Sequence, residues 1–238
     1  MDNYLSKGLL IAGLLLSAGA VSAQVSFGPR VGLNVSKISY ELSEATKKAG
    51  IKKPDSKLVF GPQIGLAVNA QFGNLALQPA ILFTMKGDKL ESGGSSLTSS
   101  YKNEETLRLR YAEIPVSLVY STNGAKGGFQ VFAGPYVAFG LSGTVKGKST
   151  YTYSAQTGTD SYKDDVKFAS KEGSSNKYYV RGLDAGANLG IGYKVDGTQI
   201  QLSYGLGLSN LTPDNSAGNG SEDKVRNRVV QLTFGYFF

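Results

Sequence analysis

Large apolar residues occupy every second position near the end of the chain, in the stretch from Arg226 to Phe238. The alternate positions there are Val230, Leu232, Phe234, Tyr236 and Phe238. Gln231, Thr233 and Gly235 lie between them and are polar or small. A period of two is typical of a β-strand with one apolar face. Phe237 breaks the rule, and we expect its side chain to point to the opposite face.

The same alternation predicts seven earlier strands, over residues 25–36, 58–72, 75–85, 107–120, 129–141, 183–195 and 200–208. Gly73-Asn74 and Asp196-Gly197 have the composition of two-residue hairpin turns. In the fourth strand the apolar positions pass from Leu107, Leu109 and Tyr111 to Ile114 and its alternate successors, which predicts a β-bulge near residues 112–113.

The predicted connections alternate between long and short. The long ones cover residues 38–57, 87–105, 143–177 and 209–225. Outer-membrane barrels have short periplasmic turns, longer external loops and an even number of strands. We therefore expect both ends of the barrel domain to lie in the periplasm.

The polar face of these strands is mostly Gly, Ala, Ser, Asn and Gln, which suits the crowded interior of a narrow barrel better than a water-facing wall. A soluble lipocalin-like barrel would need charged residues on that face. Aromatic residues on the apolar face form two predicted girdles. The girdle at the short turns contains Phe27, Phe72, Tyr120, Phe129, Tyr193, Tyr236 and Phe238, and that at the long loops contains Phe60, Phe83, Tyr111, Phe139 and Tyr179. The predicted fold is all-β, an eight-stranded antiparallel up-and-down transmembrane β-barrel with long external loops.

Residues 1–23 have the pattern of a cleaved signal peptide. Lys7 provides the positive charge, an apolar segment follows, and small residues end at Ala23. The expected organisation is a signal peptide over residues 1–23 and a barrel domain over residues 24–238, placed in the bacterial outer membrane.

Composition narrows the possible chemistry. The chain has no Cys and no His, which removes disulfides, thiol catalysis and the commonest general base and zinc ligand. We predict no catalysis, no metal and no cofactor. The formal net charge is +7, but the sequence contains no Lys/Arg run that would indicate nucleic-acid binding.

Several segments, in this order and spacing, resemble the PorT-like outer-membrane β-barrel proteins. They are G-P-R-V-G-L-N at 28–34, G-P-Q-I-G at 61–65, L-Q-P-A-I-L-F-T-M-K-G at 77–87, Y-A-E-I-P at 111–115, F-A-G-P-Y at 132–136, L-D-A-G-A-N-L-G-I-G-Y at 183–193 and Y-G-L-G-L-S-N-L at 204–211. The resemblance covers nearly all of the chain after residue 23. It implies fold and location, and it implies no catalytic residues.

Charged residues on the inward face are candidates for a network across the lumen. They are Arg30, Arg108, Arg110, Glu113 and Asp184, with Lys194 near the short turns. An unpaired buried charge is costly, so we expect Glu113 to pair with an arginine and Asp184 with Arg108 or Arg110. The network is either a polar plug that closes the barrel or a constriction that selects small anions.

The loop over residues 143–177 is the strongest interaction candidate. It combines Tyr151, Tyr153, Tyr162, Lys163, Lys167 and Lys171. It is either a solvated loop or a surface for lipopolysaccharide phosphates, glycans or a protein partner. Alternation at residues 149–154 predicts that the hairpin continues beyond the membrane.

The prediction is therefore a structural or surface-interaction barrel with a closed lumen. The alternative is a narrow pore or the barrel subunit of a secretion or transport machine. Expected partners are outer-membrane lipid with lipopolysaccharide, an unidentified protein or glycan at the external loops, and the barrel assembly machinery during biogenesis. The strand ending at Phe238 resembles the assembly signal of such barrels.

Overall fold

The computed structural model describes residues 24–154, 156–173 and 177–238. The predicted signal peptide, residues 1–23, lies outside the described residues. None of the helices in the described part of the chain is long and apolar enough to cross a membrane.

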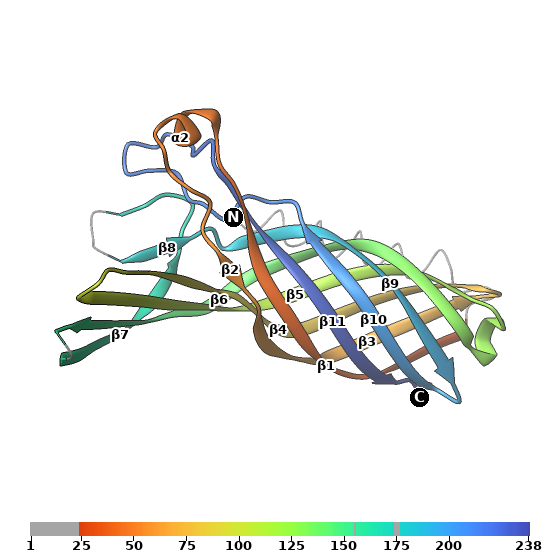
Figure 1. Cartoon of the computed structure of the whole chain (residues 1–238). Helices are drawn as coiled ribbons and strands as arrows, with labels where there is room; N and C mark the ends of the chain where they lie inside the picture. The colour runs from red at the N-terminus through yellow and green to blue at the C-terminus, as the bar shows by residue number, and fades with distance from the viewer. Residues whose placement is uncertain (1–23, 155, 174–176) are drawn as a thin grey trace.

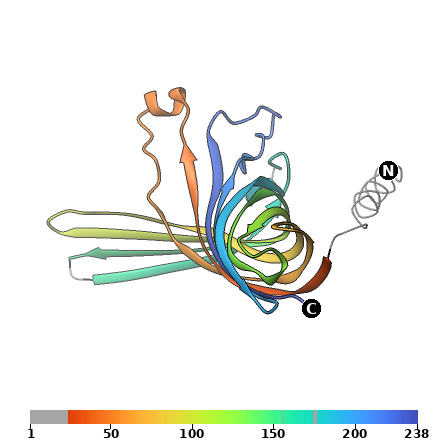
Figure 2. The same cartoon turned by 90° about the vertical axis from the view of Figure 1, so that its right-hand side faces the viewer.

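Eight strands close into an antiparallel barrel (Figures 1 and 2). Around the wall they are β1 (Gln24–Glu41), β3 (Val59–Phe72), β4 (Leu75–Ser95), β5 (Ser99–Ser121), β6 (Gly128–Tyr153), β9 (Leu183–Val195), β10 (Thr198–Gly207) and β11 (Lys224–Tyr236). The last strand pairs with the first, with Val230 opposite Val35, and this closes the ring. The predicted number and order of wall strands are confirmed.

The short turns gather at one end of the barrel. Gly73 and Gly197 have φ angles of 58° and 81°, and Asp196 has a φ of 47°, the left-handed geometry that tight hairpin turns require. The third short connection contains a 3₁₀ turn, η1 (Gly124–Lys126). The two hairpin turns predicted from the sequence are therefore confirmed.

At the other end, two hairpins extend far beyond the rest of the wall (Figure 1). The β4–β5 hairpin turns only at residues 96–98, so most of the predicted loop 87–105 is strand. β6 pairs with β7 (Gln156–Phe168), as the alternation at residues 149–154 predicted. Three short elements complete this end: α2 (Glu44–Lys48), β2 (Ser56–Lys57), which pairs with β4, and β8 (Tyr178–Val180), which pairs with β7.

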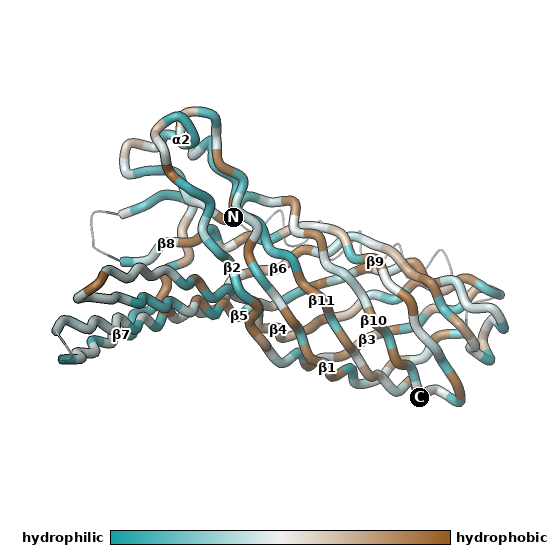
Figure 3. Tube along the Cα trace, in the orientation of Figure 1, coloured by the Kyte–Doolittle hydropathy of each residue, from teal (hydrophilic) through white to brown (hydrophobic). Residues whose placement is uncertain are grey.

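The outer wall is apolar and the interior is polar. Figure 3 shows the underlying alternation of hydrophobic and hydrophilic residues along the wall strands. Phe27, Ile81 and Leu232 are exposed on the wall, whereas Gln78, Asn34 and Gln130 are buried inside. A wall of this kind is stable against lipid, because lipid covers the apolar side chains and the ladder satisfies the backbone polar groups.

One part of the predicted inside–outside pattern is wrong. Leu109 and Tyr111, predicted to face outward, are 0% exposed and lie inside the barrel. β5 alternates without interruption, and the register shift lies in its pairing with β6, where Arg110 pairs with Ser142 but Tyr111 pairs with Gly140. The extra residue is therefore Leu141 of β6, and the bulge is not at residues 112–113.

The reason is an apolar cluster inside the barrel at the end from which the two long hairpins extend, called here the upper end. Leu109 and Tyr111 pack there with Tyr136, Val145 and Val166. Phe168 of β7 also joins this cluster, with its ring centroid 5.8 Å from that of Tyr111. Tyr111 thus leaves the predicted upper girdle, and Tyr179 lies on β8 rather than on the wall. Phe60, Phe83 and Phe139 remain exposed there.

Candidate functional site

A buried lysine lies at the centre of the charges inside the barrel. Lys86 of β4 forms ion pairs of 2.7 Å with Glu113 of β5 and 2.9 Å with Asp184 of β9. Asn227 of β11 donates a hydrogen bond of 2.8 Å to Asp184. The Lys86 ammonium also lies 4.3 Å from the ring centroid of Tyr136. These contacts join five strands of the barrel, β4, β5, β6, β9 and β11, across the lumen.

The predicted charge network is only partly assembled. Glu113 and Asp184 are buried and share one partner, Lys86, instead of pairing with arginines. Arg108 is exposed and Arg110 is half-buried on the outer face, where Arg110 contacts Ser142. Their predicted place in the lumen is wrong because β5 keeps its phase. The sequence analysis did not identify Lys86. Its side chain could have been predicted to point inward, because the preceding residue, Met85, was predicted to point outward.

Arg30 lies deeper in the lumen and has no carboxylate partner among the described residues. Its guanidinium donates to the side-chain oxygens of Gln78, Gln199 and Gln201, at 3.3, 3.1 and 2.8 Å. Gln199 donates in turn to Gln130 at 2.7 Å. A layer of glutamine amides therefore surrounds this cation and fills the cross-section of the barrel.

Around Arg30 and Glu113 the lumen holds little free space. A cavity of about 10 Å³ lies between Arg30 and Glu113, and a single water needs roughly 10–15 Å³. Below it, Phe237 points inward as predicted and packs on Ala67, Ala80 and Leu82. A cavity of about 530 Å³ opens beneath Phe237 at the short-turn end, where Lys194 lies 5.5 Å from its ring. The filled lumen is the geometry of a closed barrel.

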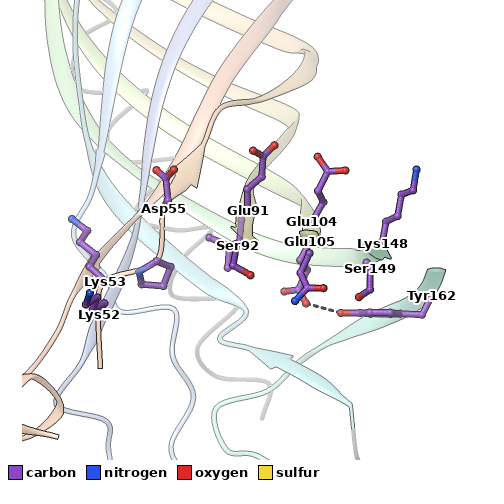
Figure 4. A pocket seen from close by; sticks show the side chains of 14 residues that line it. Lys52, Lys53, Asp55, Glu91, Ser92, Glu104, Glu105, Lys148, Ser149 and Tyr162 are labelled. Atoms are coloured by element: carbon purple, nitrogen blue, oxygen red, sulfur yellow. Dashed lines mark hydrogen bonds between the residues drawn. The ribbon is translucent and has the colours of Figure 1, made fainter. Parts of the chain in front are cut away.

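The extended strands β4, β5, β6 and β7 form a projecting sheet, called here the external sheet. Its two faces carry different side chains (Figure 4). Glu91, Glu104 and Lys148 point to one side, and Glu105 and Tyr162 point to the other. The first side continues the lipid-facing wall and is called the outer face. The second continues the lumen and is called the inner face.

Cations dominate the outer face just above the apolar wall. Arg108 and Arg110 are successive outward residues of β5, with the inward Leu109 between them. Lys146 of β6 lies directly opposite Lys163 of β7. Like charges in such a pair destabilise a sheet. Of these four residues, Arg108, Lys146 and Lys163 form no hydrogen bond or ion pair with any other described residue. The outer face therefore has unneutralised positive charge.

Two acidic side chains on the outer face, Glu91 and Glu104, are already paired, whereas Asp165, opposite Thr144, forms no ion pair with a described residue. Glu104 accepts from Lys89 at 2.8 Å and from Lys102 at 3.0 Å. These hydrogen bonds lower the pKa of Glu104 to about 2, that from Lys89 contributing most. Glu91 also pairs with Lys89, which lowers the pKa of the Glu91 carboxyl. These carboxylates neutralise Lys89 and Lys102 and leave the cations nearer the apolar wall without an ion pair.

The inner face is aromatic and acidic. Tyr162 and Tyr178 both donate to Glu105, at 2.6 and 2.5 Å. The hydrogen bond to Glu105 raises the pKa of the Tyr162 hydroxyl. Asp160 and Asp164 share this face, because they pair with Ser149 and Val145. A groove of about 640 Å³ separates the face from the segment 52–55.

The residues predicted for the loop 143–177 therefore divide between surfaces. Tyr151, Tyr153 and Tyr162 lie on the inner face by their register. Lys163 and Lys167 lie on the outer face. Lys171 lies beyond the sheet, where its backbone forms an isolated β-bridge with that of Asp214. The sequence identified the segment, but not its separation into two faces.

A closed antiparallel barrel with an apolar wall and a filled polar lumen defines an integral β-barrel of the outer-membrane class. The chain belongs to the family described as outer membrane protein beta-barrel domain, whose model matches residues 19–212. No curated protein sequence matches the chain. Among the described residues, no group of acidic side chains is arranged to hold a metal ion.

Solved barrels of low sequence identity resemble the chain. The attachment invasion locus protein Ail of Yersinia pestis is 14% identical, with a TM-score of 0.34 over 90% of this chain and 99% of Ail. Neisserial surface protein A is 10% identical, with a TM-score of 0.39 over the same shares. A mutant of the TodX monoaromatic hydrocarbon channel is 7% identical, with a TM-score of 0.27 over 93% of this chain and 91% of that one.

Proposed function

We propose that the protein is a closed outer-membrane barrel with a surface-interaction role, and that the outer face of its external sheet binds lipopolysaccharide phosphates. The observation that carries this function is the cluster of Arg108, Arg110, Lys146 and Lys163, here called the outer cation cluster, which has no acidic partner among the described residues.

The height of the cluster fits this ligand. On β5 the outward positions below Arg110 are Ala112 and Ile114, and Ala112 pairs with the exposed Phe139. The cations therefore begin where the apolar wall ends, at the level where lipid phosphates lie. Arginine binds phosphate with two parallel hydrogen bonds, and lysine adds a point charge. A bound phosphate would also remove the repulsion between Lys146 and Lys163.

The filled lumen supports a closed barrel over a narrow pore. The Lys86 ion pairs, the glutamine layer around Arg30 and the inward Phe237 lie at successive heights. A permeating ion would have to displace all three layers. Each layer is held by ion pairs, hydrogen bonds or apolar packing, so its displacement costs free energy. We place the chemistry of the protein at its external surface and assign it no catalysis.

The proposal also includes the orientation of the barrel in the membrane and the way in which the protein reaches it. The contrast between tight turns at one end and the external sheet at the other supports short turns and both termini in the periplasm. Cleavage after residue 23 and delivery by the barrel assembly machinery, with the strand ending at Phe238 as its signal, belong to the same proposal. Membership of the PorT-like group rests on the quoted sequence segments alone.

The test compares lipopolysaccharide binding by the purified barrel and a variant in which Arg108, Arg110, Lys146 and Lys163 are changed to Gln. We expect the variant to bind at least tenfold more weakly, and wild-type binding to weaken with added salt, because screening acts on exposed charges. Lys52→Gln with Lys53→Gln is the control, in the segment that faces the inner side of the external sheet across the groove. Equal binding by the fourfold variant and the wild type would contradict the proposal, provided that both show heat-modifiable mobility on gels.

A further inference from the structure

Three tyrosines on the inner face of the external sheet each lie across a glycine of the neighbouring strand. Tyr162 lies opposite Gly147, Tyr151 opposite Gly158, and Tyr101 opposite Gly94. A Cβ atom added at Gly147 would lie 2.1 Å from Cε1 of Tyr162, and one added at Gly158 would lie 2.3 Å from Cε2 of Tyr151. The glycines therefore provide the space in which these rings rest on the sheet.

This arrangement leaves the opposite side of each ring open to solvent. Tyr101, Tyr151 and Tyr162 are 54%, 50% and 45% exposed, although each ring is seated on backbone. Tyr101 and Tyr151 are direct neighbours across β5 and β6. Tyr162 lies four residues further along β7 than Gly158, or roughly 13 Å along the strand. Together the three rings form an exposed aromatic surface on the inner face, called here the aromatic platform.

Hydrogen-bonding side chains fill the row between the rings. Ser92, Asn103, Ser149 and Asp160 follow one another across the four strands on this face. Glu105 lies one row lower, beside Tyr162, and holds its hydroxyl at 2.6 Å. A ligand stacked on the rings would thus meet hydroxyl, amide and carboxylate groups at its edges.

The charge of the inner face selects among ligands that stack on aromatic rings. Its carboxylates, Glu105, Asp160 and Asp164, would repel the phosphates of a nucleic acid or of lipid A. The cations of this sheet lie mainly on the opposite face. The groove of about 640 Å³ beside Tyr162 is also lined by the segment 52–55, which adds Lys52, Lys53 and Asp55 as hydrogen-bonding groups on its far side. The mixed charge of this lining favours an extended, hydroxyl-rich chain over a strongly charged one.

We propose that the aromatic platform binds an uncharged glycan, a chain of hexopyranose units stacked on Tyr101, Tyr151 and Tyr162. One face of a pyranose ring is rich in C–H groups, which gain dispersion energy against an aromatic ring and meet its negative π-face. The hydroxyl groups at the edge of the sugar donate to and accept from Asn103, Ser149 and Asp160. This inference deepens the proposed surface-interaction role, but it uses the face opposite the outer cation cluster.

Affinity electrophoresis of the detergent-solubilised full-length protein tests the platform. The gels contain a neutral mannan, a neutral galactan or a neutral β-glucan. We expect at least one polysaccharide to retard the wild type. Tyr151→Ala with Tyr162→Ala should weaken that retardation by roughly tenfold or more, because the change removes two of the three rings on which the sugars stack. Tyr151→Phe with Tyr162→Phe keeps the rings and should retain most of the retardation.

Two outcomes would overturn the platform. One is the absence of retardation with all three polysaccharides, and the other is equal retardation of the wild type and the double alanine variant. The fourfold glutamine variant of the outer cation cluster is the matched control on the same strands. It should lose lipopolysaccharide binding and keep glycan retardation, so that failure of the outer-face proposal and failure of the platform give different results.

Discussion

Gly147 and Tyr162 face each other across β6 and β7, and the tyrosine ring occupies the space that a side chain at residue 147 would need. The ring is at the exposed side of the sheet, so it can swing away at small cost. We predict that Gly147→Ala lowers stability by less than about 1 kcal/mol, the range of a single cross-strand pair. The same change should break the hydrogen bond from Tyr162 to Glu105.

That broken bond is measurable, because Glu105 raises the pKa of the Tyr162 hydroxyl. In Gly147→Ala the Tyr162 pKa should fall toward its usual value, as seen by NMR titration with labelled tyrosine. Tyr162→Phe removes this hydroxyl and thereby assigns its signal, which makes it the control. An unchanged Tyr162 titration in Gly147→Ala would mean that the glycine does not position the ring.

The pairing of Glu104 with Lys89 and Lys102 makes the external sheet sensitive to acid. The folded-state pKa of Glu104 is about 2, below its usual 4.5. A lowered pKa stabilises the folded state above the unfolded pKa, and this contribution is lost as pH falls from about 4.5 through about 2. We expect the Glu104 carboxyl signal to titrate near pH 2 and Lys89→Ala to raise that midpoint. A midpoint near 4.5 in the wild type would contradict the pairing.

Removal of the buried cation should destabilise the barrel strongly. Lys86→Met leaves Glu113 and Asp184 buried without a counter-charge, and breaking one partner of a buried pair costs about 3–5 kcal/mol. The measurement is urea-induced unfolding in micelles, followed by gel mobility. Adding Glu113→Gln and Asp184→Asn to Lys86→Met should recover most of the loss. A single Lys86→Met variant as stable as the wild type would show that the pairs are not required.

Adjacent residues of β5 test the corrected phase of that strand. Leu109→Asp places a charge in the apolar cluster beside Tyr111, where the side chain is 0% exposed, and should prevent folding into lipid vesicles or slow it greatly. Arg108→Asp lies on the exposed face and should fold nearly as well as the wild type. If Arg108→Asp prevented folding and Leu109→Asp did not, the original prediction that Leu109 faces outward would be supported instead.

Conductance measurements test the filled lumen. We expect no stable openings in planar bilayers for the wild type. Phe237→Ala should also remain closed, because the glutamine layer around Arg30 and the Lys86 ion pairs lie above the position of Phe237. Reproducible open states of the wild-type protein would favour a narrow pore instead.

The alternation of apolar residues predicted the wall well, because burial against lipid enforces a strict period of two. The segment from Val230 to Phe238 illustrates this, with Phe237 pointing inward between outward neighbours. A shift of the strand register by one residue would turn every side chain to the other face. The rule failed at Leu109 and Tyr111, where the assumption that large apolar residues face lipid conflicts with an apolar cluster inside the barrel. Arg108 and Arg110 were misplaced for the same reason.

The candidate sites were less predictable than the wall. The parity of Lys86 was available from its neighbour Met85, but its two partners come from β5 and β9, and only the closed ring brings them together. The pairing of Tyr162 with Gly147 depends on the register of the β6–β7 hairpin. That register is set by its turn and cannot be read from the spacing of the two residues alone.

β6 contains 26 residues and spans roughly 86 Å at about 3.3 Å per residue, against roughly 25 Å for the apolar band of such barrels. The same strand is therefore both part of the membrane wall and part of the external sheet. A pulling force on a molecule attached to Tyr151 would be transmitted along the strand axis, and it would load the hydrogen bonds of the barrel side by side instead of one at a time. The hydrogen-bond ladder of the barrel therefore resists tension applied along the axis of β6.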